Sequence, residues 1–141
     1  MKTIFVDANV FLRFFTKDDR GQASQAERLF RRADEGAIAL VTGPPVLFEV
    51  AWTLRSAYKR SPPEVLDVLS RIAGFPGLRL LDGALVETAI ALARASGQEF
   101  ADAYLLALAH ENGADAVATF NRKHFETMGA ALYPFQSPRR R

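Results

Sequence analysis

Three carboxylic acids in this 141-residue chain stand where a carboxylate could do chemistry. Asp7 ends a short β-rich run, Glu49 falls on the margin of an apolar helical face, and Asp102 shares a helical stripe with apolar side chains. Thr119 and Asn121 end a later β-rich run. Clustered carboxylates repel one another, and a hard divalent cation relieves that repulsion. Ligation by oxygen atoms alone suits Mg²⁺ or Mn²⁺.

Each of these residues also has a purely structural interpretation. Asp7 and Asn121 are both good helix N-caps, and such a cap contributes about 1 kcal/mol. Glu49 is equally compatible with a solvated acid on a helix flank. Asp102, as an acid in a first helical turn, would stabilise the helix N-terminus by about 0.3–1 kcal/mol. That account does not explain why Asp102 faces apolar residues, and the combination of the acids favours a metal site.

Segments of β-rich sequence alternate with segments whose apolar residues recur at helical spacing. Glycine and proline mark the ends of several helices, as at the Pro44-Pro45 pair and at Gly97. The pattern predicts strands at 3–6, 37–42, 77–81, 116–120 and 131–135. It predicts helices at 8–16, 23–33, 44–59, 62–73, 84–96 and 100–112, and a short helix at 122–128.

This alternation predicts an α/β fold with a mostly parallel sheet covered by helices on both faces. Right-handed crossovers gather the carboxyl ends of the strands along one edge of such a sheet, where ligands bind. Asp7 and Asn121 each follow a strand, so we expect both at that edge. The length fits one domain, predicted at 1–135, followed by a basic tail at 136–141.

Composition excludes several other classes of protein. The chain contains no cysteine, so it has neither a disulfide framework nor a thiolate metal site, and with only two histidines a zinc site is disfavoured. No apolar run approaches the roughly 18 residues of a membrane span, and the N-terminus lacks the pattern of a signal peptide. We therefore expect a cytoplasmic protein without a membrane partner. The formal charge of +2 gives only weak support for a polyanionic partner.

Four segments together resemble a known family. FVDANVFLRF, FEVAWTLR, FADAYLLALA and ATFNRKHF are similar, in this order, to the signature segments of PIN domains. Size and motif order more narrowly resemble the VapC-type toxins of bacterial type II toxin–antitoxin pairs. The resemblance extends from about residue 2 to residue 135. It implies a three-layer α/β/α sandwich with a short, mostly parallel sheet of four to five strands.

The resemblance also implies a metal-dependent endoribonuclease that uses Mg²⁺ or Mn²⁺. Asp7, Glu49 and Asp102 match the acidic metal ligands and catalytic residues of the family, with Asn9 and Thr119 in supporting places. Asn121 stands where many members carry an acid, and an amide offers a carbonyl oxygen without charge. Three carboxylates would then remain, which puts a tightly held second metal in doubt. For a toxin, the resemblance implies an RNA substrate, a homodimer and a small cognate antitoxin protein.

Two further sets of residues are candidates for contacts with partners. The basic side chains that follow the first acid are candidates for RNA phosphate contacts, although a solvated helix end and turn explains them as well. They are Arg13, Lys17 and Arg20. Phe48 and Trp52 are predicted to project away from the core at helical spacing, which suggests a dimer or partner interface. A second packing contact within the domain is the alternative.

Other functions remain as alternatives. A phosphatase of the haloacid-dehalogenase type needs a second acid two residues after the first, and Asn9 occupies that position. A receiver-type signalling domain needs paired acids at the first strand, and that pattern is missing. A DNA nuclease stays open, because a metal site does not itself select the sugar. A PIN-like module that binds RNA or protein and is catalytically weak or inactive is the main alternative, favoured by Asn121.

Overall fold

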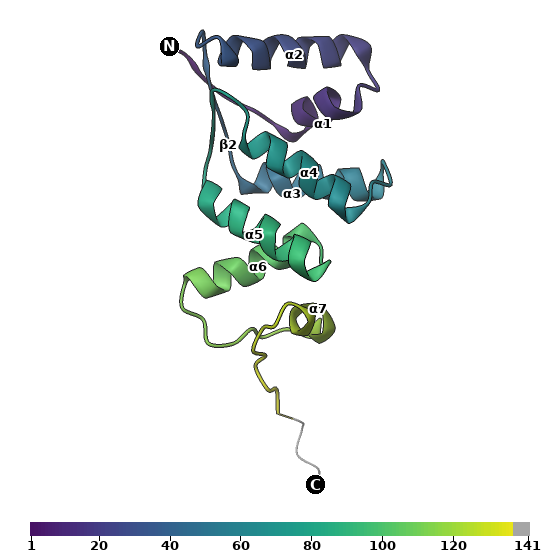
Figure 1. The fold of residues 1–141 in the computed structure, drawn as a ribbon, viewed down its shortest axis with the longest axis vertical. Coiled ribbons are helices and arrows are strands. Elements are labelled where there is room, and N and C mark those ends of the chain that lie inside the picture. Colours follow the sequence, from purple (N-terminus) through teal and green to yellow (C-terminus); the bar gives the residue numbers. More distant parts are fainter. Residues whose placement is uncertain (137–141) are drawn as a thin grey trace.

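The computed structural model describes residues 1–136 and contains a small parallel sheet with helices beside and below it in Figure 1. Its strands are β1 (Thr3–Phe5), β2 (Ala39–Thr42) and β3 (Leu78–Leu80), in the order β1-β2-β3. The β1–β2 register places Thr3 opposite Ala39, and the β2–β3 register places Thr42 opposite Leu80. The predicted α/β class and parallel sheet are therefore confirmed.

Seven helices lie within the described residues, at or near the predicted positions. The second helix begins three residues earlier than predicted, because the Asp19 side chain accepts a hydrogen bond from the Gln22 amide at 3.0 Å and caps it. The fourth begins with a complete capping box between Ser61 and Glu64. The helices are α1 (Ala8–Thr16), α2 (Arg20–Asp34), α3 (Pro44–Ser56), α4 (Pro62–Ala73), α5 (Gly83–Ser96), α6 (Phe100–Glu111) and α7 (Arg122–Thr127).

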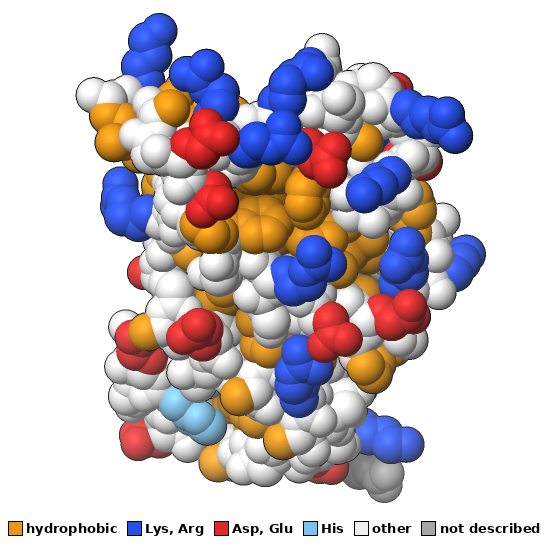
Figure 2. Space-filling model, turned by 45° about the horizontal axis from the view of Figure 1, so that its top comes forward, with side chains coloured by type: hydrophobic (Ala, Val, Ile, Leu, Met, Phe, Trp, Pro, Cys, Tyr) orange, Lys and Arg blue, Asp and Glu red, His pale blue; other side chains and the backbone are white. Residues whose placement is uncertain are grey.

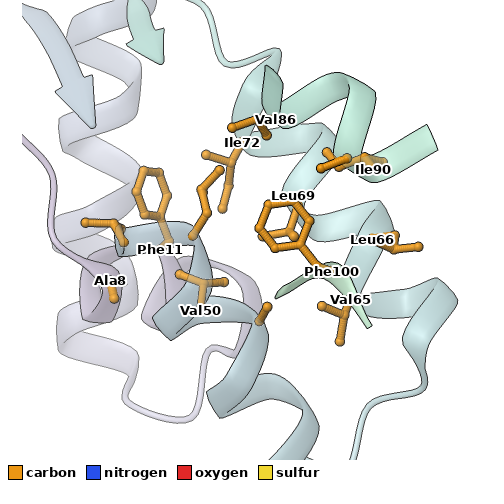
Figure 3. Close-up of a cluster of buried hydrophobic side chains, with 14 of the residues drawn as sticks. Ala8, Phe11, Val50, Val65, Leu66, Leu69, Ile72, Val86, Ile90 and Phe100 are labelled. Carbon is orange, nitrogen blue, oxygen red and sulfur yellow. The ribbon is translucent and has the colours of Figure 1, made fainter. Parts of the chain in front are cut away.

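One apolar core joins the helices to the sheet (Figure 3). Phe11 of α1 and Val50 of α3 are fully buried, as are Leu69 and Ile72 of α4. Phe100, at the start of α6, is 2% exposed and belongs to the same cluster. The amphipathic faces of these helices therefore supply the packing that the short strands cannot supply alone. Within residues 1–136, no helix combines the length and the apolar character needed to cross a membrane.

The sheet has three strands, and the prediction of four to five was wrong. The two missing ones, predicted at 116–120 and 131–135, form only a single parallel bridge between Val117 and Leu132. An isolated pair of strands is marginal without further strands or a packed face. Figure 1 shows this C-terminal segment beyond α6, at the opposite end of the long axis from β1. The predicted tail at 136–141 lies almost entirely outside the described residues.

Close contact between the start of β3 and the end of α2 depends on Gly77. Its φ of +76° lies in the left-handed region, and a Cβ there would lie 2.5 Å from the Ala33 carbonyl oxygen. We expect Gly77→Ala to lower the free energy of unfolding by about 2–4 kcal/mol, because backbone strain and a backbone clash add. Urea unfolding followed by circular dichroism measures this loss.

Gly97→Ala is the matched control for that substitution. Gly97 has a φ of +72°, but a Cβ there would meet nothing within 4 Å. We expect a loss of about 1 kcal/mol from backbone strain alone. Equal losses in the two variants would show that the approach of Gly77 to Ala33 does not matter for stability.

Candidate functional site

Asp7 is held at the end of β1 by hydrogen bonds between β1 and β2. The Val6 amide donates to the Val41 carbonyl at 2.9 Å, and the buried Thr42 hydroxyl donates to the Val6 carbonyl at 2.9 Å. Asp7 itself is exposed, and its carboxylate accepts a hydrogen bond from the Ala8 amide at 2.7 Å. Asp7 therefore caps α1, as one interpretation of the sequence predicts. The strand end fixes its backbone and leaves the carboxylate facing solvent.

Two other predicted residues, Asn9 and Glu49, are also exposed. Asn9 lies in the first turn of α1, close behind Asp7 in the chain. Glu49 lies on α3, whose opposite side buries Leu47, Val50 and other apolar residues in the core. The packing of α3 thus leaves the Glu49 carboxylate in solvent. The environment of Glu49 therefore matches the structural interpretation from the sequence, a solvated acid on the flank of a helix.

Asp102 has a different environment from the other two acids. It lies in the first turn of α6 with its side chain 21% exposed, and its Oδ2 lies 3.2 Å from Nδ1 of His124 on α7. Sequence reasoning did not single out His124, although it lies within the ATFNRKHF segment. His124 follows Asp102 by 22 residues, and no sequence pattern links two residues at that separation. They meet because the chain turns after α6 and brings α7 back to the start of α6.

A cavity of about 420 Å³ adjoins Asp102, between α3 and the start of α6. Arg55 and Glu99 line this cavity and pair at 2.8 Å, and the predicted interface residue Trp52 lines it too. Trp52 is 71% exposed, whereas the Phe48 ring lies 5.0 Å from the Tyr104 ring and 5.4 Å from the Phe100 ring. Phe48 therefore makes a packing contact within the chain, the stated alternative. Trp52 remains an exposed candidate for a partner contact.

Thr119 and Asn121 lie in the turn before α7. The Thr119 hydroxyl accepts a hydrogen bond from the Asn121 amide at 2.9 Å, which orders this turn. The Asn121 side chain is exposed and makes no capping bond to α7. The expected position beside Asp7 at the sheet edge is not observed. The physical reason is that segment 116–120 does not join the sheet.

Of the three residues predicted to contact RNA phosphates, Arg13 already binds other side chains of this chain. Its guanidinium donates to Gln22 Oε1 at 2.8 Å and contacts Asp18 and the Tyr58 hydroxyl, each at 3.3 Å. The Tyr58 hydroxyl donates to Asp18 and, with smaller effects from neighbouring groups, lowers the pKa of that carboxyl below its ordinary value. Lys17 and Arg20 are exposed. Figure 2 shows basic side chains interspersed with acidic ones, around an apolar hollow.

These positions decide whether one copy of the chain can hold a metal ion. The donor chemistry fits Mg²⁺ or Mn²⁺, because the candidate ligands are carboxylate and amide oxygens. The placement does not fit, since no three Asp, Glu or His side chains within residues 1–136 lie close enough to share one ion. Asp7 lies at the start of α1, Glu49 on α3 and Asp102 on α6, and in the described part of the chain the three do not form one group of ligands.

A comparison with models of known protein families identifies the family of this chain. The family model described as PIN domain matches residues 4–130, from β1 to the turn after α7. The chain belongs to the PIN domain family. The match includes every predicted site residue, from Asp7 to Asn121. No curated protein matches the chain.

Membership in the PIN domain family indicates nuclease-type activity, since PIN domains are generally metal-dependent nucleases. The exposed Asp7 and the partly buried Asp102 are consistent with such a role. Neither carboxylate is taken up by a salt bridge to Lys or Arg within the described residues. The partners that they do have are the Ala8 amide for Asp7 and His124 for Asp102.

Two substitutions of Asp7 separate its capping role from any role in chemistry. Asp7→Ala removes the hydrogen bond to the Ala8 amide, so we expect the free energy of unfolding to fall by about 1 kcal/mol. Asp7→Asn keeps a side-chain oxygen at the cap and should lose less than about 0.5 kcal/mol. Urea unfolding of both variants checks this. Equal destabilisation by the two substitutions would contradict the assignment of Asp7 as the cap of α1.

Proposed function

We propose that this PIN domain is a metal-dependent endoribonuclease that hydrolyses RNA phosphodiester bonds. The observation that carries the proposal is the match to the PIN family over residues 4–130, together with an acid at the end of β1 and another in the first turn of α6. From the family match, Mg²⁺ or Mn²⁺ is the proposed ion and Asp7, Glu49 and Asp102 are its proposed ligands, which would have to come closer together than they lie in this structure. Asn9, Thr119 and Asn121 have supporting roles.

The proposed substrate is single-stranded RNA, because unstacked bases can be contacted by protein side chains. Trp52 supports this choice, since an exposed indole beside Arg55 and the cavity next to Asp102 can stack on a base. Lys17 and Arg20 are the proposed phosphate contacts. Arg13 is a weaker candidate, because a phosphate would have to replace its present partners Gln22 and Asp18.

Biologically, we propose a VapC-type toxin that acts in the cytoplasm as a homodimer and is inhibited by a small cognate antitoxin. The order of the four sequence segments supports this narrower proposal. Because Asp7 and Glu49 are exposed, a basic side chain of a partner could reach their carboxylates and pair with them. Such pairing would block a cation and substrate at the same time.

A catalytically weak module that binds RNA or protein is the second candidate. Two observations favour it: Asn121 stands where many relatives have an acid, and one copy does not gather three acids. This candidate retains the RNA contacts of the first and lacks its hydrolysis. Cleavage assays separate the two.

Purified protein should cut a mixed RNA pool with Mg²⁺ or Mn²⁺ and should not cut it with EDTA. We expect Asp7→Asn and Asp102→Asn each to lower the rate about 100-fold or more, because each removes a charge worth several kcal/mol in the transition state. Glu87→Gln, at an exposed acid on α5, is the matched control and should cut normally. Equal cutting by all four proteins would indicate a contaminating ribonuclease, and no cutting would favour the binding module.

Induced expression in a bacterial host tests the toxin proposal. We expect growth to stop with the wild-type chain and to continue with Asp7→Asn, because free ribonuclease activity depletes cellular RNA. Colony counts after induction measure the effect, and immunoblots show whether the two chains accumulate equally. Normal growth with an active wild-type enzyme would contradict the toxin role and leave the ribonuclease proposal standing.

A further inference from the structure

A second pocket, of about 400 Å³, lies between α1 and α2. These two helices pack against each other at the end of the molecule that holds the N-terminus (Figure 1). The polar members of the lining are Arg13 and three neutral amides, those of Asn9, Gln22 and Gln25. The apolar members are Val10, Ala26 and Leu29. An apolar surface with a few convergent polar groups is the usual composition of a site for a small planar ligand.

The guanidinium of Arg13 is already oriented in this pocket. Its Nε donates to Gln22 Oε1 at 2.8 Å, and its Nη1 lies 3.3 Å from both the Asp18 carboxylate and the Tyr58 hydroxyl. Among the described residues, these bonds leave Nη2 without a protein acceptor. A phosphate bound there would be repelled by the Asp18 carboxylate, so this group suits an uncharged polar ligand better.

The same bond fixes the orientation of the Gln22 side chain. A guanidinium can only donate hydrogen bonds, so the Gln22 atom that faces it must be the amide oxygen. The Nε2 amino group of Gln22 is then left for a ligand, and it too can only donate. Two oriented donors, from Arg13 and Gln22, therefore line one pocket. A ligand that fits them presents two neighbouring acceptors.

Among the RNA bases, guanine has this arrangement of acceptors. Its O6 and N7 are adjacent acceptors on one edge, whereas adenine has an amino donor beside N7. Cytosine presents an amino donor on the corresponding edge, and the O4 of a uracil is a single acceptor. The apolar side chains of Val10 and Leu29 can contact the face of the ring. The pocket therefore favours guanine over the other three bases.

The pocket also lies close to the first acid of the candidate site. Asn9 is part of its lining and follows Asp7 by two residues, so their Cα atoms are at most about 7.6 Å apart. Both side chains are exposed. A nucleotide whose base fills the pocket has the length to bring an adjoining phosphate near Asp7.

We propose that the pocket between α1 and α2 binds a guanine base of single-stranded RNA, with Arg13 and Gln22 donating to its O6 and N7. Asp18 and Tyr58 are positioning residues, because they hold Arg13 in place. The base must be unstacked to enter, which requires a single strand. This inference rests on the proposed function for its polymer, RNA. It needs no metal ion, so it does not depend on where the three acids lie.

Fluorescence anisotropy in EDTA tests the base preference without cleavage. The probes are fluorescein-labelled oligouridine and the same strand with one guanine. Wild-type protein should bind the strand with guanine at least about 5-fold more tightly, because a good pair of base contacts discriminates by that factor or more. Inosine keeps O6 and N7 and should bind like guanine, whereas 7-deazaguanine lacks the N7 acceptor and should lose most of the preference. Equal affinity for guanine and uracil strands would overturn the proposal.

Gln22→Glu is the variant that tests the donor. It keeps an oxygen for Arg13 but replaces the amino group with a second acceptor, so the preference for guanine should disappear. The fold should persist, because the Asp19 cap binds the backbone amide of residue 22, and circular dichroism checks this. Gln98→Glu makes the same change of charge outside this pocket and should keep the preference. A preference that survives Gln22→Glu would overturn the proposal.

Binding and cleavage together separate this inference from the ribonuclease proposal. A protein that prefers guanine strands in EDTA but cuts no RNA with Mg²⁺ or Mn²⁺ would remove the ribonuclease proposal and support the pocket. A protein that cuts RNA but binds guanine and uracil strands equally would overturn the pocket and leave the ribonuclease standing. Folded protein that binds neither strand would also overturn the pocket as a base site.

Discussion

The hydrogen bonds of the strand backbones are the constraint on which the rest of this structure depends. Three very short strands hold the sheet, and β2 alone has a neighbour on both edges. At the carboxyl end of the β1–β2 pair, the buried Thr42 hydroxyl donates a hydrogen bond to the Val6 carbonyl. That bond fixes the backbone just before Asp7, the first acid of the candidate site. Within the described residues, the other edge of β1 has no partner strand.

Helix packing determines how far each acid lies from the others. α3 and α6 are joined through Phe48, Phe100 and Tyr104, so Asp102 lies beside a cavity between these helices. Glu49 stands on the same helix as Phe48 but faces solvent. The apolar core therefore orders α3 and α6, while the described residues contain no group of three acids that could share one ion.

The C-terminal segment links the fold to the proposed activity. It carries Thr119 and Asn121, it keeps His124 in contact with Asp102, and it exposes Phe120 and its aromatic neighbours.

Local sequence determined most of the elements and the family. The apolar periodicity of 62–73 and its Ser61–Glu64 box specify α4, and the Asp7 cap specifies the start of α1, because these signals act over a few neighbouring residues. The four motifs identified a PIN domain for the same reason. Only the tertiary structure decided that Phe48 packs inward, that His124 meets Asp102 and that 116–120 stays off the sheet. Those outcomes depend on contacts between segments distant in sequence, and a β-rich run cannot specify which edge it will pair with.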